Sequence, residues 1–120
     1  MERIKNTQPV GNLKISQDVI ATIARVATLE VPGVNSLAEA TVRIGWLFSR
    51  GIIKKAVSVD VGDDFVEIDV SVNLDFGAKI TETCTAIQSG VKDNVQTMTG
   101  MAVEKVNVFV AGIVFPGNED

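Results

Sequence analysis

The stretch FVEIDVSVNLDF, residues 65–76, decides the fold because apolar and polar side chains alternate strictly along it. The apolar side chains are Val66, Ile68, Val70, Val72, Leu74 and Phe76. The polar ones between them are Glu67, Asp69, Ser71, Asn73 and Asp75. A period of two is typical of a β-strand with one buried and one exposed face. The sequence therefore predicts a long strand whose inner face is apolar and whose outer face is acidic and solvated.

The segments on both sides of this strand extend the pattern. Before it, AVSVDVGDD (56–64) alternates and ends in a Gly-Asp-Asp turn, which predicts a β-hairpin. After it, a helix is expected from Ala78 to a stop at Gly100. The apolar stripe of this helix consists of Ile80, Cys84, Ile87, Val91, Val95 and Met98. A last strand over VEKVNVFVAGIVF (103–115) alternates at Val106, Val108 and Val110 before Pro116.

The N-terminal part predicts a strand, a helix and a second helical or looped segment. GNLKIS (11–16) alternates like a short strand, and Ser16 can cap a helix that stops before Pro32. Its apolar side chains are Val19, Ile20, Ile23, Ala24, Val26 and Ala27. Ser36 and Glu39 have the spacing of a capping box, so a short helix or ordered loop is expected after them.

These elements define the expected fold class. Their order is β-α-(α)-β-β-α-β, which makes an α+β domain of two layers with the helices packed on one face of a small mixed sheet. Ferredoxin-like and KH-like arrangements both fit this order. With 120 residues, the chain is expected to form a single domain over 1–120 with an ordered core at about 11–115.

The residue inventory excludes most familiar catalytic sites. The chain has no histidine and no tyrosine, and its one cysteine, Cys84, lies on a helical apolar stripe, where a buried structural thiol is expected. The acidic residues of the hairpin indicate a solvated face, because their spacing does not bring them together around a metal ion. Neither a phosphate-binding loop nor a basic footprint is present. We expect no enzyme, no cofactor, no nucleic acid and no small-molecule substrate.

The charge is divided between the two halves of the chain. Residues 1–56 hold eight Lys or Arg against four Asp or Glu, and residues 57–120 hold three against eleven. This asymmetry permits head-to-tail contact between copies of the chain. The single cysteine indicates a reducing compartment, and the longest apolar run, residues 108–115, is far shorter than the ~20 residues of a membrane-spanning helix. We therefore expect a cytoplasmic protein.

The segment RIGWLFSRGIIKK, residues 43–55, holds the only tryptophan among four cations. Such a segment suits an anionic membrane interface. The competing interpretation is that its aromatic side chains close the edge of the core, since tryptophan is highly buried on average. The candidate interaction residues are those of this segment and of the acidic face: Arg43, Trp46, Leu47, Phe48, Arg50, Lys54, Lys55, Glu67, Asp69 and Asp75.

The second half of the chain resembles the alkaline shock protein family, the envelope stress response proteins of Gram-positive bacteria. The similar features are Phe76-Gly77, an IQ..V segment at residues 87–91, Thr99-Gly100 and a V..VNV.V.G strand at residues 103–112. In the first half, G.L.IS..VI..IA..A...VPGV at residues 11–34 is also similar, so the resemblance covers nearly the whole chain.

The resemblance implies a small non-enzymatic scaffold of the stress response. It implies a domain that self-associates and docks to partner proteins at the cytoplasmic face of the cell membrane, with a homo-oligomer as the first expected assembly. Because relatives join this domain to transmembrane helices, a membrane-anchored protein of the same family is a further candidate partner. The alternative function is peripheral membrane binding through the Trp46 segment.

Overall fold

The computed structural model describes residues 14–39 and 55–117. Its sheet is built around β3 (Val66–Asp75), the strand that the alternating stretch predicts. Val66, Ile68 and Leu74 are fully buried, whereas Asp69 and Asp75 are exposed. The predicted hairpin is confirmed, because β2 (Val57–Val61) pairs antiparallel with β3 and the Gly62 N–H donates to the Phe65 carbonyl at 2.9 Å.

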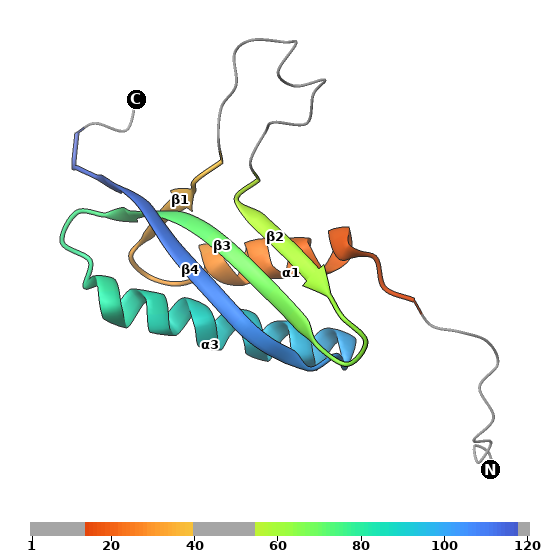
Figure 1. Ribbon diagram of the computed structural model, residues 1–120. Helices are drawn as coiled ribbons and strands as arrows, with labels where there is room; N and C mark the ends of the chain where they lie inside the picture. The colour runs from red at the N-terminus through yellow and green to blue at the C-terminus, as the bar shows by residue number, and fades with distance from the viewer. Residues whose placement is uncertain (1–13, 40–54, 118–120) are drawn as a thin grey trace, which may run out of the picture.

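The sheet is mixed, as predicted. On its other side, β3 pairs in parallel with β4 (Val103–Val114) along nearly its whole length. The α3 helix (Ile80–Thr99) connects these two strands, as a parallel pair requires. Gly100 ends α3 in the left-handed conformation, at φ 74°. Helices α1 (Gln17–Leu29) and α3 lie side by side on one face of the sheet (Figure 1). The predicted α+β class with two layers is therefore confirmed.

The first strand differs from the prediction in its position. Of the expected strand at residues 11–16, Lys14 to Ser16 are not a strand, and the earlier residues lie outside the described part. Ser16 instead caps α1, its hydroxyl accepting a hydrogen bond from the Val19 N–H at 3.2 Å. The first strand is β1 (Val34–Leu37), where the sequence pattern predicts the capping box of Ser36 and Glu39.

The capping box does not form because both residues have tertiary partners. The Ser36 hydroxyl accepts a hydrogen bond from the Asn73 side chain of β3 at 3.1 Å. Glu39 forms an ion pair with Arg25 of α1. The short helix or ordered loop predicted after them lies outside the described residues.

Strands β1 and β2 share one edge of β3. β1 pairs with the second half of β3 and β2 with the first half, both antiparallel. The two strands meet at Ser71, whose carbonyl accepts from the Ala38 N–H at 2.9 Å and whose N–H donates to the Ala56 carbonyl at 2.7 Å. The chain thus leaves the sheet and returns to it beside a single residue of β3.

The core lies between the helices and the inner face of the sheet. Its helical part comes from Ile20, Ile23, Ala24, Ala27, Ile87, Val91 and Val95. The predicted helical stripes were too wide, because Val19, Val26, Ile80 and Met98 are exposed. Phe76, predicted to point inward, is also exposed and stacks on Phe115 with ring centroids 4.6 Å apart. The reason is that β3 ends at Asp75, so the alternation does not reach Phe76.

Candidate functional site

The candidate site is the open face of the sheet, the face that points away from α1 and α3. Among the described residues, no helix covers this face (Figure 1). The strand registers place a common set of mostly polar side chains on it. They are Ser36, Ser58, Asp60, Glu67, Asp69, Ser71, Asn73, Asp75, Lys105, Asn107 and Phe109.

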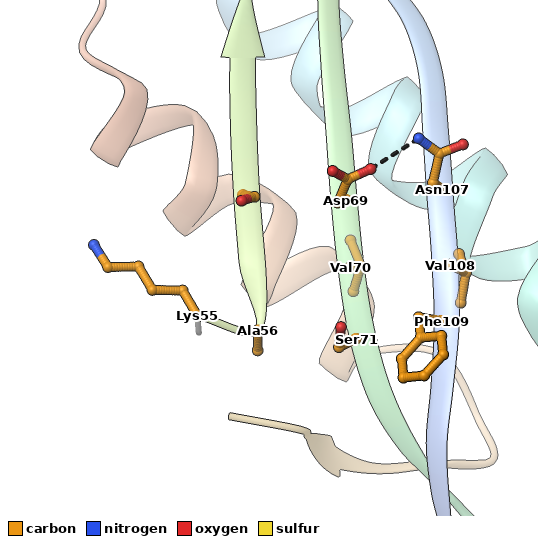
Figure 2. A pocket seen from close by; sticks show the side chains of 9 residues that line it. Lys55, Ala56, Asp69, Val70, Ser71, Asn107, Val108 and Phe109 are labelled. Carbon is orange, nitrogen blue, oxygen red and sulfur yellow. Dashed lines mark hydrogen bonds between the residues drawn. The ribbon is translucent and has the colours of Figure 1, made fainter. Parts of the chain in front are cut away.

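Phe109 is the large apolar side chain in the middle of this open face. It lies in β4 beside Ser71 of β3, and 65% of its surface is exposed. A hollow of about 720 Å³ lies on one side of it, lined by Lys55, Ser58, Asp69 and Asn107 (Figure 2). A smaller hollow lies on its other side, lined in part by residues 37–39 and Asn73. The open face therefore carries an aromatic side chain between two polar depressions.

The three predicted acidic residues lie on the open face but do not converge. The Glu67 carboxylate is 3.8 Å from the Lys105 ammonium. Asp69 accepts a hydrogen bond from the Asn107 side chain at 2.8 Å (Figure 2), and Asp75 accepts one from the Asn35 side chain at 3.0 Å. Each carboxylate is thus held by a different partner on a neighbouring element. This arrangement suits a charged docking surface rather than a shared metal ion or an acid-base pair.

Of the candidate residues in the basic and aromatic segment 43–55, the structure describes only the last, Lys55. Lys55 is exposed and lines the larger hollow together with Asp69. The other candidates of this segment lie outside the described residues: Arg43, Trp46, Leu47, Phe48, Arg50 and Lys54. The structure therefore brings Lys55 and Asp69 to one depression of the open face, and the Trp46 segment stays a prediction.

Phe109 is the residue of the candidate site that sequence reasoning missed. The signal was available, because Phe109 lies between Val108 and Val110, in the polar phase of the alternation that buries Val106. An aromatic side chain in that phase must lie on the outer face. Sequence reasoning counted it only as part of an apolar strand.

Cys84 is half-buried, so the prediction of a buried thiol is correct only in part. Thr83, the neighbouring residue, takes the buried position on α3 instead. Partial burial raises the pKa of the Cys84 thiol, because desolvation disfavours the thiolate. A thiol with a raised pKa is a poor nucleophile at neutral pH.

Comparison with known proteins identifies the family. A sequence model of the alkaline shock protein family, described as having a cell envelope-related function, matches residues 5–115. The uncharacterized protein Spy1535 of Streptococcus pyogenes is 32% identical over 109 residues, covering 90% of this chain and 83% of the relative. The uncharacterized protein YqhY of Bacillus subtilis is 28% identical over 114 residues, covering 88% of this chain and 79% of the relative.

A solved structure supports the fold independently. The structure titled MamM-CTD E289A is similar with a TM-score of 0.51 at 14% sequence identity, covering 81% of this chain and 99% of that chain. At this identity, the likeness concerns the fold alone. In the described part of the chain, no helix is both long and apolar enough to cross a bilayer. The family match confirms the resemblance seen in the sequence, and the chain belongs to the alkaline shock protein family, whose function is related to the cell envelope.

Proposed function

We propose that this protein is a non-enzymatic scaffold that self-associates and docks to partner proteins at the cytoplasmic face of the cell membrane. The docking role is inferred from one observation, the exposure of Phe109 on the open face of the sheet. The envelope-related family supplies the cellular setting. A membrane-anchored member of the same family is the first candidate partner.

The composition of the open face supports docking. A protein interface typically has an aromatic anchor at its centre and a polar, hydrated rim. Phe109 has the position of the anchor, and Ser58, Asp69, Asn73 and Asn107 surround it in the two hollows. A strand with one solvated face commonly alternates apolar side chains toward the core with polar side chains toward water. Phe109 departs from this pattern, because it is a large apolar side chain on the solvated face.

The non-enzymatic assignment rests on the chemistry of the described side chains. The carboxylates of Glu67, Asp69 and Asp75 are each held by a separate partner. Cys84 has a raised pKa, and the chain contains no histidine that could activate it. A positioned pair of acid and base, which most hydrolytic mechanisms need, is therefore not found among the described residues.

The test is the distribution of the protein between the membrane and soluble fractions of cells that express it at its native level. We expect Phe109→Ala to reduce the membrane-associated share several-fold. The matched control is Val26→Ala, which removes a similarly exposed apolar side chain, 53% exposed, from α1 on the opposite side of the molecule. Equal membrane shares for the wild type and Phe109→Ala would contradict docking through the open face.

Liposomes made from extracted lipids separate protein docking from direct lipid binding. We expect the purified protein not to co-sediment with protein-free anionic liposomes at low salt. Co-sedimentation with a blue shift of the Trp46 emission would instead support the alternative, peripheral binding through residues 43–55. The tryptophan signal is specific because the chain contains one tryptophan and no tyrosine.

A further inference from the structure

The outer edge of β4 is the longest strand edge that the described residues leave unpaired. β4 pairs with β3 on one side, and no described strand pairs with its other side. An unpaired edge presents a row of backbone N–H and C=O groups that can pair with another strand. Natural proteins usually protect such edges with charges, proline, bulges or covering elements.

The first half of this edge is protected by two glutamines of α3. The Gln88 side-chain amide donates a hydrogen bond to the Val106 carbonyl at 3.1 Å. The Val103 N–H donates to the Gln96 side-chain oxygen at 3.0 Å. These two backbone groups therefore point away from β3, and α3 occupies them. Glu104 and Lys105 add exposed charges to the same half.

The second half of the edge lacks this protection. The pairing with β3 is regular from Lys105 to Val110, between two bulges. Because backbone groups alternate in direction along a strand, Val108 and Val110 point their N–H and C=O the same way as Val106, away from β3. Among the described residues, none forms a hydrogen bond with these outward-pointing backbone groups of Val108 and Val110. In addition, residues 106–114 contain no charged side chain.

We propose that this protein forms a two-fold dimer in which the β4 strands of two copies pair antiparallel through Val108 and Val110. The proposal rests on the self-association in the proposed function and names its surface. The edge is self-complementary, because the uncharged second halves of two β4 strands can pair without bringing like charges together. The opposite edge of the sheet is less suitable, since β2 has only five residues, carries Asp60 and precedes Asp63 and Asp64.

The pairing has a consequence for the open face. In an antiparallel pair, residues opposite each other lie on the same side of the combined sheet. The two open faces therefore become one continuous surface that carries two copies of Phe109. The dimer would offer a partner two aromatic anchors in place of one, which increases the avidity of docking.

The test uses proline as a probe of the edge. Val108→Pro removes an N–H that points away from β3, so pairing with β3 is retained while pairing with a second copy is blocked. The matched control is Val59→Pro on the β2 edge. Val59 is half-buried like Val108. It is three residues from Ala56, which bonds to Ser71 of β3, and three residues from Gly62, which bonds to Phe65 just before β3. Its N–H therefore also points outward.

Sedimentation over a concentration series at low and high salt measures the assembly. We expect a wild-type dimer that persists in high salt, a Val108→Pro dissociation constant raised about tenfold or more, and an unchanged Val59→Pro dimer. If the wild type dimerises and a folded Val108→Pro variant dimerises equally well, the β4 pairing is wrong while self-association stands. If the wild type is monomeric at every concentration, self-association in the proposed function fails as well. Dissociation by salt alone would instead support head-to-tail contact between charged regions.

Amide hydrogen exchange tests the same pairing without a variant. We expect exchange at the Val108 and Val110 amides of the wild type to slow as the protein concentration rises, while exchange at the Val59 amide stays constant. Exchange at Val108 and Val110 that is independent of concentration, in a protein that sediments as a dimer, would overturn the proposal. This measurement decides the question if Val108→Pro does not fold.

Discussion

Gly33, which lies between α1 and β1, occupies a position where any side chain would be strained and crowded. Its φ is +98°, in the region that favours glycine, and its carbonyl accepts a hydrogen bond from the Asp75 N–H at 2.8 Å. A Cβ atom at this position would lie 3.2 Å from both the Ala78 Cβ and the Thr83 hydroxyl. Gly33 therefore allows the start of β1 to approach α3 and the end of β3 closely.

Gly33→Ala is expected to lower the free energy of unfolding by about 1–3 kcal/mol, because alanine strains the backbone and crowds Thr83. The matched control is Gly90→Ala in α3, where nothing lies within 4 Å of the added Cβ. That change should stabilise the protein by about 0.5–1 kcal/mol, because alanine favours the helix. Urea unfolding, monitored by circular dichroism, measures both changes. If the free energy of unfolding changed in the same direction in both variants, the role given to Gly33 would be wrong.

Cys84 predicts a specific dependence of stability on pH. Because its pKa is raised in the folded state, its thiol stays protonated where the unfolded chain already ionises. The stabilising contribution is therefore complete below the pKa of the unfolded thiol and is lost as the pH rises through the higher pKa of the folded thiol. Relative to Cys84→Ser, the wild type should lose stability over this alkaline range. A difference between the two proteins that is constant from neutral to alkaline pH would show that Cys84 does not contribute.

Helices α1 and α3 begin differently. Alanine substitutions at their N-cap residues are therefore expected to change the free energy of unfolding by different amounts. Ser16 caps α1 through its hydroxyl, whereas Lys79 at the same position of α3 makes no side-chain capping bond. Ser16→Ala should lower the free energy of unfolding by about 1 kcal/mol. Lys79→Ala should change it by less than about 0.5 kcal/mol. Thermal or urea unfolding of the two variants provides the comparison, and equal losses would mean that the hydroxyl of Ser16 is not acting as a cap.

The elements that were predicted correctly are those determined by local sequence. The alternation from Val66 to Leu74 defines β3, because burial on one face of a strand follows directly from a period of two. Ser16 and Gly100 likewise mark the limits of their helices through local hydrogen bonds and backbone conformation. These signals act over a few residues and are visible in the sequence alone.

The elements that were missed depend on distant partners. Ser36 and Glu39 match a capping box locally, but Asn73 and Arg25 bind them in the folded chain. Only part of the candidate site could be predicted from the sequence, because the rest also depends on distant partners. The outward direction of Glu67, Asp69 and Asp75 follows from alternation, whereas the place of Phe109 among them depends on the pairing of β4 with β3. Strand pairing between distant segments is not encoded in local periodicity.

At the scale of the whole molecule, the core and the open face can be altered independently. Ile68 is fully buried in β3, so Ile68→Ala should lower the free energy of unfolding by about 2–5 kcal/mol. Phe109→Ala removes a mostly exposed side chain and should change stability by no more than about 0.5 kcal/mol. Chemical unfolding measures both variants. A large loss of stability in Phe109→Ala would mean that this side chain serves the fold rather than docking.

The junction of β1 and β2 at Ser71 has a consequence for the pairing register of both strands. The chain leaves the sheet at Ala38 and returns at Ala56, and both residues bond to the same residue of β3. An insertion or deletion between these two points therefore shifts neither register. The two attachment points of this segment are therefore fixed by one residue of β3, whatever the number of residues between them.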